Sequence, residues 1–214
     1  MIDPNTPLAP GTPHAVLDVP MDSWPGGCEI VHVAAGCFWG VERFYWQLPG
    51  VVTTAVGYMG GSDPHPTYRS VCSGTTGHAE TVRVVFDPER VTVDEVLRVF
   101  WENHDPTQGN RQGNDIGSQY RSAVFCTTGH QVRVARAQRE AMQEQLLAAG
   151  HGVVTTEIVE PEHVGEFHLA EEFHQQYLHK NPGGYCNHGP NGMSCPVGLV
   201  DLPAQTDVLP PTAG

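Results

Sequence analysis

The sequence predicts a two-layer domain of the α/β or α+β class. Short segments rich in Val, Ile and Thr, typical of strands, interleave with helix-type segments in the order β-α-β and then β-α-β-α-β. The chain of 214 residues has the length of one domain, and its 39% of apolar residues are enough for a core. The interleaving therefore favours two layers over a sandwich of strands or a bundle of helices.

The first half of the chain is expected to be ordered from residue 30. Residues 1–29 hold six prolines and no sustained periodicity, which predicts a Pro-rich tail. An apolar strand over 30–35 is interrupted by Gly36, and a helix follows over 37–46. A β-rich stretch over 51–59 then leads into a loop with two prolines.

The middle of the chain contains a clear strand and a clear helix. Residues 80–86 alternate between two faces, which predicts a strand. One face carries Val82, Val84 and Phe86. Thr92 and Glu95 then fit a capping box, in which each side chain accepts from an unpaired backbone N–H, so we expect a helix to begin there. Residues 105–117 are rich in Gly, Asn and Asp and are predicted to form a loop.

The second half repeats the alternation before it becomes irregular. A strand is expected over 118–126, and a second box between Thr128 and Gln131 opens the longest helix. Another β-branched strand is expected over 153–159, and residues 166–180 are predicted to be helical in part. The remaining chain is predicted to be a long coil with two cysteines.

The charge and hydropathy of the chain exclude several classes of protein. A formal net charge of −13 disfavours binding to nucleic acid and to an anionic membrane surface. No apolar run approaches the roughly 18 residues of a spanning helix. The first lysine or arginine is Arg43, so the start of the chain lacks the positive region of an export signal. These features predict a cytoplasmic protein.

Cys37 is the first candidate for chemistry, because it lies where an apolar strand passes into a helix. Unpaired N–H groups at a helix N-terminus favour a thiolate, which is the nucleophilic form of cysteine. The alternative is a small buried apolar residue. Gly36 and Gly40 favour the first interpretation, since they let another molecule approach the backbone. Phe38 and Trp39 cannot face the same way, so one of them is expected to line a pocket beside Cys37.

Two further cysteines and four histidines occur near the end of the chain. Cys186 and Cys195 flank a segment rich in Gly, Pro and Asn, in which two sulfurs can meet with little strain. We favour a redox pair over two idle thiols, because exposed free thiols in a flexible tail are a liability. A metal site is disfavoured: His174 and His179 are five residues apart, which is off one helical face.

Four polar residues have an ordinary and a functional interpretation. Glu80 opens a strand, where a carboxylate is most often solvated; if buried near a thiol it would become a proton donor. Tyr68 and Tyr120 could be half-buried packing residues or could donate to a developing oxyanion. Asp115 is of the type that normally stabilises a turn. The residues alone favour the solvated interpretation of Glu80 and leave the alternatives for Tyr68 and Tyr120 open.

A set of motifs resembles the A-type peptide methionine sulfoxide reductases, which reduce oxidised methionine. The resemblance covers residues 30–198. Its motifs are Gly36-Cys37-Phe38-Trp39-Gly40, Pro66-Thr67-Tyr68, Gly77-His78-Ala79-Glu80, Trp101-Glu102-Asn103-His104-Asp105-Pro106, Gly117-Ser118-Gln119-Tyr120-Arg121-Ser122 and Gln175-Gln176-Tyr177-Leu178-His179-Lys180-Asn181-Pro182. It implies a two-layer α+β sandwich with a mixed sheet, related to the ferredoxin-like plait, with a long C-terminal coil. The Pro-rich tail of residues 1–29 and a C-terminal tail of residues 199–214 lie outside it.

The resemblance also implies roles for the residues that reduce the sulfoxide. Cys37 would attack the sulfoxide sulfur, and Glu80 would protonate the departing oxygen. Tyr68 and Tyr120 would donate hydrogen bonds to that oxygen. Phe38 and Trp39 would form the walls of a pocket for the S-methyl group, and Asp115 would contact the backbone side of the substrate.

The resemblance implies that the enzyme is recycled by thiols alone. Cys186, within residues 183–198, would resolve a sulfenic acid on Cys37, and Cys195 would take over the resulting disulfide. Thioredoxin or a small dithiol would be the reductant, with no metal or other cofactor, and we expect a monomer. The substrates would be free and peptide-bound methionine S-sulfoxide, which gives a role in protein repair under oxidative stress. Two alternatives are a thiol peroxidase and a metal-binding or partner-binding module built on the 12 histidines.

Overall fold

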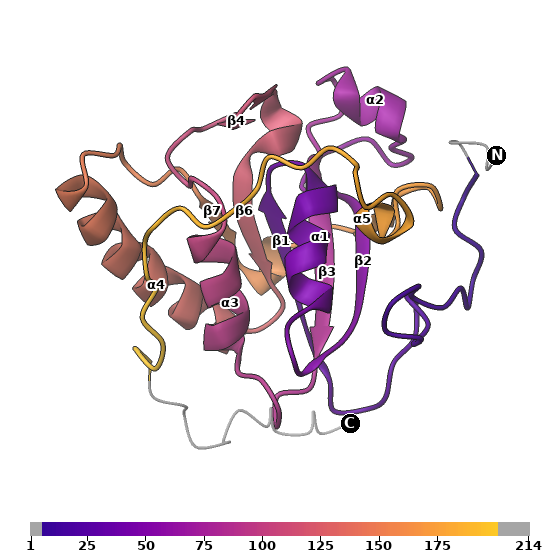
Figure 1. Ribbon diagram of the computed structural model, residues 1–214, viewed down its shortest axis with the longest axis horizontal. Coiled ribbons are helices and arrows are strands. Elements are labelled where there is room, and N and C mark those ends of the chain that lie inside the picture. The colour runs from indigo at the N-terminus through magenta and orange to yellow at the C-terminus, as the bar shows by residue number, and fades with distance from the viewer. Residues whose placement is uncertain (1–5, 201–214) are drawn as a thin grey trace, which may run out of the picture.

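A computed structural model describes residues 6–200, and a mixed sheet forms its centre (Figure 1). Neighbouring strands of this sheet follow the order β7-β6-β1-β3-β2-β8. Its strands are β1 (Glu29–Ala35), β2 (Val51–Met59), β3 (Ala79–Phe86), β6 (Ser122–Cys126), β7 (Glu157–Val159) and β8 (His168–Leu169). The helices are α1 (Phe38–Trp46), α2 (Tyr68–Cys72), α3 (Val93–Glu102), α4 (Gly129–Ala148) and α5 (Tyr177–Lys180). A separate hairpin joins β4 (Arg111–Gln112) to β5 (Asp115–Ile116).

The predicted α+β class and the plait are confirmed. The four central strands lie in the order β6-β1-β3-β2 and all pair antiparallel. The sheet is mixed because α4 carries the chain from β6 to β7, and these two strands pair parallel. A helical crossover of this kind is what a parallel pair requires.

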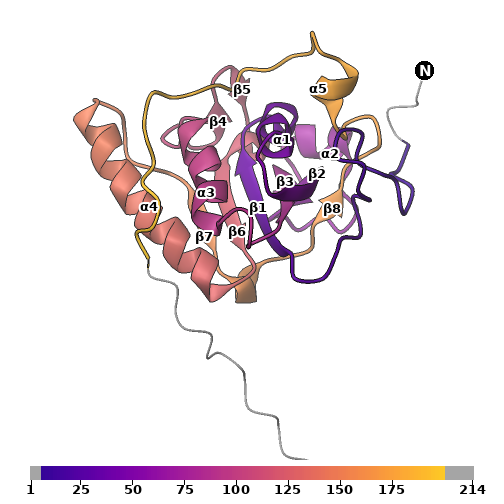
Figure 2. The same cartoon turned by 60° about the horizontal axis from the view of Figure 1, so that its bottom comes forward.

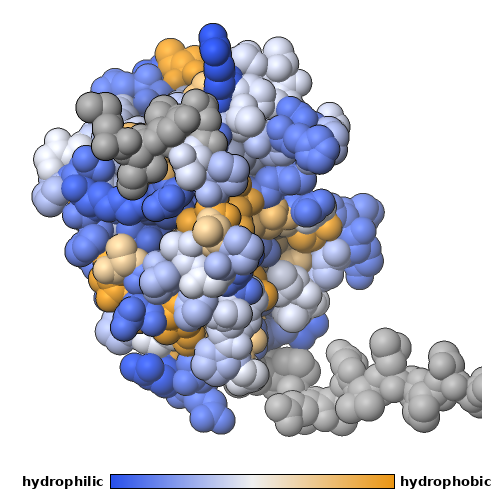
Figure 3. Space-filling view, turned by 90° about the vertical axis from the view of Figure 1, so that its right-hand side faces the viewer, coloured by the Kyte–Doolittle hydropathy of each residue, from blue (hydrophilic) through white to orange (hydrophobic). Residues whose placement is uncertain are grey.

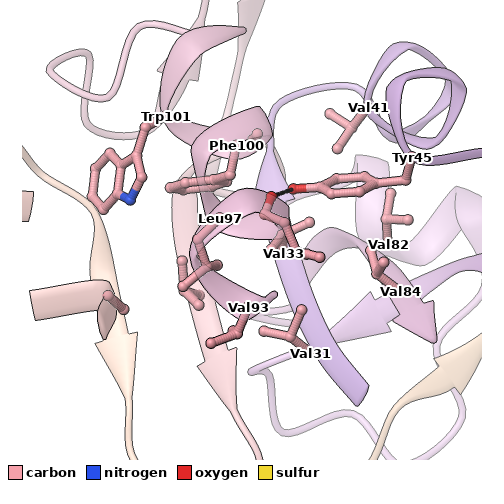
Figure 4. Packing of buried hydrophobic residues seen from close by; sticks show 14 of the residues in the cluster. Val31, Val33, Val41, Tyr45, Val82, Val84, Val93, Leu97, Phe100 and Trp101 are labelled. Carbon is pink, nitrogen blue, oxygen red and sulfur yellow. Dashed lines mark hydrogen bonds between the residues drawn. The ribbon is translucent and has the colours of Figure 1, made fainter. Parts of the chain in front are cut away.

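The main core lies between the sheet and the helices α1, α3 and α4 (Figure 4). Tyr45 of α1 packs beside Val82 and Val84 of β3, and its hydroxyl donates to the Val96 carbonyl of α3 over 3.3 Å. Thr92 caps α3 as predicted: its hydroxyl accepts from the Glu95 N–H, and the Glu95 carboxylate accepts from the Thr92 N–H.

The second face of the sheet is also covered, by the chain between β7 and β8. The smaller cluster of this face consists of Ala34, Met59, Ala79, Ala123 and Phe125, with Val159, Val164 and Phe167 packed against it. The predicted alternation of β3 is confirmed, since Val82, Val84 and Phe86 all belong to the core on the helix side. Glu80 is in phase with these residues, so its side chain is placed on the buried helix side.

Several predicted elements differ in extent. The strand expected over 118–126 begins only at Ser122, because residues 118–120 form a turn of 3-10 helix. The strand expected over 153–159 is reduced to β7, and the partly helical 166–180 consists of β8 and the short helix α5. Helix α2 was not predicted, although Thr67 and Ser70 cap it reciprocally.

The second capping box is incomplete. The Thr128 hydroxyl accepts from the Gln131 N–H, as expected at the start of α4. The Gln131 side chain does not return the bond. Its oxygen accepts from the Thr127 N–H at 2.8 Å and its amide donates to the Ile30 carbonyl. Gln131 is fully buried against β1, and its two bonds satisfy backbone groups at the end of the sheet.

Residues 6–28 of the predicted tail pack against the domain. His14 and Met21 are each 1% exposed. The His14 Nε2 donates to the Thr54 hydroxyl at 2.8 Å, and this hydroxyl donates to the Glu42 carboxylate of α1 at 2.9 Å. Gln176 also donates to Glu42, from its backbone and from its side chain. This part of the predicted tail therefore contributes to the interior.

The chain after α5 runs over the domain as an extended segment. It passes from α5 along the top of the view, beside β5, and down along α4 (Figure 2). Its described part is irregular, in agreement with the predicted coil. Residues 201–214, which make up most of the predicted C-terminal tail, lie outside the described residues.

The described surface has few exposed large hydrophobic side chains, and they come from separate parts of the chain. They are Val16, Ile116, Leu147, Val153, Leu169, Tyr185, Val197 and Leu199. On the side drawn in Figure 3, hydrophobic residues form small separate areas among hydrophilic ones. Within residues 6–200, no helix combines the length and the hydropathy that crossing a bilayer would require.

Candidate active site

Cys37 is the residue at the N-terminal cap of α1, directly after β1. The backbone N–H groups of Trp39 and Gly40, in the first turn of α1, lower the pKa of its thiol. Burial acts in the opposite direction, since only 6% of the residue is exposed, and the nearby Glu80 charge adds to this effect. A helix N-terminus contributes about 0.3–2 kcal/mol. Full burial can shift a pKa by about 3–5 units, or roughly 4–7 kcal/mol.

The expectation that the helix end favours a thiolate at Cys37 is therefore wrong. Burial dominates, and the pKa of the Cys37 thiol lies well above its usual value. The thiol is held in its protonated form until another group takes or exchanges the proton.

Glu80 is buried, which overturns the solvated interpretation that the residues alone favoured. It is 2% exposed, at the start of β3 on the helix side of the sheet. Its Oε2 accepts from the backbone N–H of Phe38, over 2.9 Å. Burial raises the pKa of Glu80 to about 8, although the Phe38 N–H opposes the shift. The carboxyl therefore holds a proton at neutral pH.

Tyr68 and Tyr120 lie close to Glu80, one from α2 and one from the 3-10 turn before β6. Burial and the Glu80 charge raise the pKa of both hydroxyls above the usual value, so both remain hydrogen-bond donors. Burial raises the pKa of the Cys72 thiol, on α2, and the nearby Tyr68 and Tyr120 hydroxyls oppose this shift. Cys72 is thus a neighbour of the site that sequence reasoning did not find.

Phe38 and Trp39 diverge, as two adjacent residues at the start of a helix must. Phe38 is 1% exposed and packs in the core against Tyr58, with 5.9 Å between the ring centroids. Trp39 is half-buried and stacks on Tyr177, with centroids 3.8 Å apart. The indole of Trp39 therefore forms the accessible aromatic surface beside Cys37.

Asp115 lies on β5 and holds the C-terminal segment. It accepts from the Tyr185 hydroxyl at 3.0 Å and from the Asn187 side chain at 2.9 Å. The Asn187 amide also donates to the Gln112 carbonyl, at 3.1 Å. These bonds tie residues 185–187 to the β4–β5 hairpin.

Gly36 and Gly40 allow other groups to pack closely against the backbone of α1 and its start. The groups that do so are side chains of the same protein. A Cβ on Gly40 would lie 2.9 Å from the Cys186 sulfur and 2.5 Å from the His188 Nδ1. A Cβ on Gly36, at φ +99°, would lie 2.6 Å from the Gln112 side chain. The Cys186 sulfur therefore rests on the first turn of α1, the turn that Cys37 caps.

The cation nearest to Cys186 is Arg43. Its guanidinium donates to the Cys186 sulfur over 3.3 Å, from the next turn of α1. His188 fixes the same stretch, because its Nε2 donates to the Ala35 carbonyl at 2.7 Å. The stretch around Cys186 is thus anchored on both sides of Cys37.

Cys195 is placed in different surroundings. It is 3% exposed and packs in the main core, and its backbone N–H donates to Glu102 of α3 at 3.0 Å. Burial and the Glu102 charge raise the pKa of its thiol to about 12. All six cysteines are free. Cys186 and Cys195 therefore lie against different helices, Cys186 against α1 and Cys195 against α3.

The histidines of the chain's end have roles in hydrogen bonding. The Nδ1 of His174 accepts from the Trp39 indole N–H at 3.1 Å. Within residues 6–200, one group of three potential metal ligands lies close together, Glu160, Glu162 and His163, and it includes no predicted site residue.

Sequence reasoning missed His174 and Glu171, which contact the predicted aromatic pocket. The burial of Glu80 could have been predicted from the sequence, because its side chain lies on the same face of β3 as Val82 and Val84. No comparable signal existed for His174 and Glu171, since their partners are more than a hundred residues away in the chain.

The comparisons with known proteins agree on one family. A family model described as peptide methionine sulfoxide reductase matches residues 29–194. A protein of Salinispora tropica named peptide methionine sulfoxide reductase MsrA is 56% identical over 202 residues, which are 92% of this chain and 90% of that protein.

Two solved structures are similar over most of the chain. Methionine sulfoxide reductase A of Corynebacterium diphtheriae has a TM-score of 0.75 and 44% identity, and the match covers 89% of this chain and 93% of the other. Mxr1 from Saccharomyces cerevisiae in reduced form has a TM-score of 0.66 and 34% identity, covering 76% and 91%.

Proposed function

Since the chain belongs to the peptide methionine sulfoxide reductase family, an oxidoreductase family that reduces methionine sulfoxide, we propose that Cys37 and Glu80 perform this reduction. Methionine S-sulfoxide, free or in peptides, is the proposed substrate. The reaction would repair proteins after oxidative damage.

The proposed chemical step transfers one oxygen atom. The Cys37 sulfur attacks the sulfoxide sulfur while Glu80 protonates the oxygen, and the thiol proton of Cys37 replaces the one that Glu80 gives. The sulfur of the substrate gains two electrons and becomes a thioether. Cys37 loses two electrons and becomes a sulfenic acid, so a thiol and a sulfoxide are converted into a sulfenic acid and methionine.

One observation carries this proposal: a buried carboxyl with a raised pKa beside a buried thiol. A sulfoxide oxygen leaves readily only when protonated, and Glu80 holds a proton near neutral pH. The hydroxyls of Tyr68 and Tyr120, which stay protonated, can donate to the same oxygen. Trp39 and Phe38 would hold the S-methyl group, and Asp115 would contact the backbone of the substrate.

We further propose that Cys186 resolves the sulfenic acid. Its sulfur lies on the first turn of α1, which makes it the thiol best placed to condense with Cys37. The condensation forms the Cys37–Cys186 disulfide and releases water. The Arg43 guanidinium donates to the Cys186 sulfur and would stabilise negative charge that develops there.

Cys195 would then attack Cys186, release the Cys37 thiol and leave a Cys186–Cys195 disulfide. Thioredoxin, or a small dithiol in its place, would reduce this disulfide by thiol exchange. The proposed cycle balances with these thiols alone and requires no metal or other cofactor. Because Cys195 starts in the core, the segment has to leave α3 before this exchange.

The decisive experiment measures reduction of the separated S and R epimers of methionine sulfoxide with excess dithiothreitol. The wild-type protein should reduce the S epimer only, and Cys37→Ser should reduce neither. Cys28→Ser, on a thiol that belongs to no described site contact, is the matched control and should keep its activity. Appreciable turnover by Cys37→Ser, or faster turnover of hydrogen peroxide than of the sulfoxide, would exclude the proposed function.

A further inference from the structure

His174 is a buried residue that contacts the aromatic pocket from behind and has no part in the steps above. It is 2% exposed. Its ring lies 4.3 Å from the Tyr68 ring and 5.7 Å from the Trp39 ring, measured between centroids, and is nearly parallel to the indole, at 17°. The Phe38 ring lies at 5.5 Å. His174 therefore touches three of the proposed site residues at once.

The hydrogen bond from Trp39 fixes the state of this histidine. The indole Nε1–H donates to the His174 Nδ1 over 3.1 Å, so Nδ1 carries no proton and the neutral ring holds its proton on Nε2. Nε2 faces the Glu171 carboxylate at 4.0 Å. Burial lowers the pKa of His174 to about 4, despite the neighbouring Glu171. The ring is thus an acceptor for Trp39 throughout the neutral range.

Glu171 connects the same histidine to α2. One carboxylate oxygen accepts from the Tyr58 hydroxyl at 2.8 Å, and the other accepts from the Tyr68 backbone N–H at 2.9 Å. The second bond holds Tyr68, the first residue of α2 and a proposed donor to the sulfoxide oxygen. Only 11% of the Glu171 side chain is exposed.

Trp39 needs such a constraint because it is only half-buried. Its outer contact is the stacked ring of Tyr177, which restricts the plane of the indole but leaves its rotation within that plane free. The bond to His174 removes this rotation, since it fixes the direction of the indole N–H. An ordered wall loses no rotamer freedom when the substrate binds.

We propose that His174 and Glu171 are positioning residues that orient Trp39 and Tyr68 and so form the S-methyl pocket before the substrate arrives. This inference rests on the proposed function, in which Trp39 is a wall of that pocket. The wall interacts with the methyl group in the ground state and in the transition state alike. Its loss should therefore raise KM more than it lowers kcat.

The first test compares two substitutions of His174 in steady-state turnover of methionine S-sulfoxide with excess dithiothreitol. His174→Phe keeps an aromatic ring but removes the acceptor, and KM should rise roughly 3- to 10-fold, the effect of one lost hydrogen bond. His174→Asn places an amide oxygen near the position of Nδ1 and should recover part of the loss. Equal KM values for the wild type and His174→Phe would overturn the proposal.

Oxidation of Cys37 by hydrogen peroxide separates positioning from general damage, because peroxide needs no methyl pocket. This rate should stay within about twofold of the wild type in both variants. A parallel fall of the peroxide and sulfoxide rates would mean that His174 merely supports the fold, and would overturn the proposal. The peroxide rate also keeps the test valid if a variant is less stable.

A double-mutant cycle with Trp39→Phe gives the sharpest result. This substitution removes the indole N–H, so adding His174→Phe should cause no further rise in KM. Additive effects would show that His174 does not act through Trp39 and would contradict the inference. A wild-type protein without sulfoxide reductase activity would instead remove the proposed function, so the two failures are distinguishable.

Discussion

At the scale of single residues, the main feature is a thiol and a carboxyl buried together. The Glu80 charge opposes ionisation of Cys37, and burial opposes ionisation of both. A neutral Glu80 removes that repulsion, and in the proposed reaction it is also the proton donor for the sulfoxide oxygen. The raised pKa of each group thus belongs to one coupled arrangement, which would give a proton to the oxygen as the sulfur attacks.

We expect Glu80→Gln to slow the chemical step by about 10²- to 10⁴-fold, the usual contribution of a positioned general acid. Glutamine keeps the shape of the side chain and can still accept from the Phe38 N–H, but it donates no proton. The wild-type rate should also fall as pH rises through about 8, where Glu80 loses its proton, and the variant should lack this fall.

Single-turnover rates between pH 6 and 9 measure both effects. Glu144→Gln, on the exposed side of α4, is the control and should behave as the wild type. An unchanged rate in Glu80→Gln would remove Glu80 from the acid role.

At the scale of elements, the segment after α5 is bound to the domain at several points. Asn191 is a second anchor besides Asn187: its side chain donates to the carbonyls of Trp101 and His104 at 2.8 and 2.7 Å. The Gly198 N–H donates to Asp94 at 2.9 Å. In the proposed cycle Cys186 would therefore react first, and Cys195 would follow only after these bonds open.

We expect Cys186→Ser to release about one methionine per enzyme in a single turnover, because the sulfoxide is reduced before any disulfide forms. Cys37 should then remain as a sulfenic acid, and turnover with thioredoxin should nearly vanish. Quantifying methionine and trapping the sulfenic acid with a dimedone-type reagent measure this. A normal rate with thioredoxin would contradict the assignment of Cys186.

The companion variant Cys195→Ser should stop one step later. Its oxidised form should contain the Cys37–Cys186 disulfide, and its response to thioredoxin should be slower. Peptide mapping of the oxidised protein identifies the bridge. A bond between Cys37 and Cys72, which lies beside Tyr68 and Tyr120, would show that the resolving thiol has been assigned wrongly.

At the scale of the whole molecule, buried ionisable groups make stability depend on pH in two opposite ways. Burial lowers the pKa of His14, His32, His104 and His174 to between about 3 and about 4. The unfolded chain binds these protons below about pH 6.5 and the folded chain does not, so stability rises with pH up to that value.

Burial raises the pKa of Glu42 to about 7 and of Glu80 to about 8. Here the folded state holds the extra protons, so stability falls with rising pH above about 4.5.

The four histidines outweigh the two carboxyls in the acidic range, and only the carboxyls act above pH 6.5. We therefore expect the free energy of unfolding to rise from pH 4.5 to a maximum near 6.5 and to decline towards pH 8. Urea denaturation at several pH values measures this. Glu80→Gln should reduce the alkaline decline, and the exposed Glu144→Gln should leave the curve unchanged. A steady rise between pH 6.5 and 8 would contradict the expectation.

Much of the fold could be predicted because it depends on local patterns. The strands β1, β2 and β3 and the helix α1 follow from apolar runs, alternation and the Gly36 break, and their observed bounds agree within one residue. The start of α3 follows from Thr92 and Glu95, whose side chains satisfy each other's backbone N–H groups within four residues. Short-range sterics and hydrogen bonds decide such features, and they are contained in the sequence.

The sequence by itself determined the order of strands and helices along the chain and the position of Cys37 between a strand and a helix. It also determined the family that the motifs indicate. Only the tertiary structure decided the environment of each group. It buried Glu80 beneath the first turn of α1, raised the pKa of Cys37, separated Cys195 from Cys186 and placed His174 behind Trp39. A pKa or an orientation depends on desolvation and on partners distant in the chain, such as the 135 residues between Trp39 and His174. Folding alone brings these groups within a few ångströms.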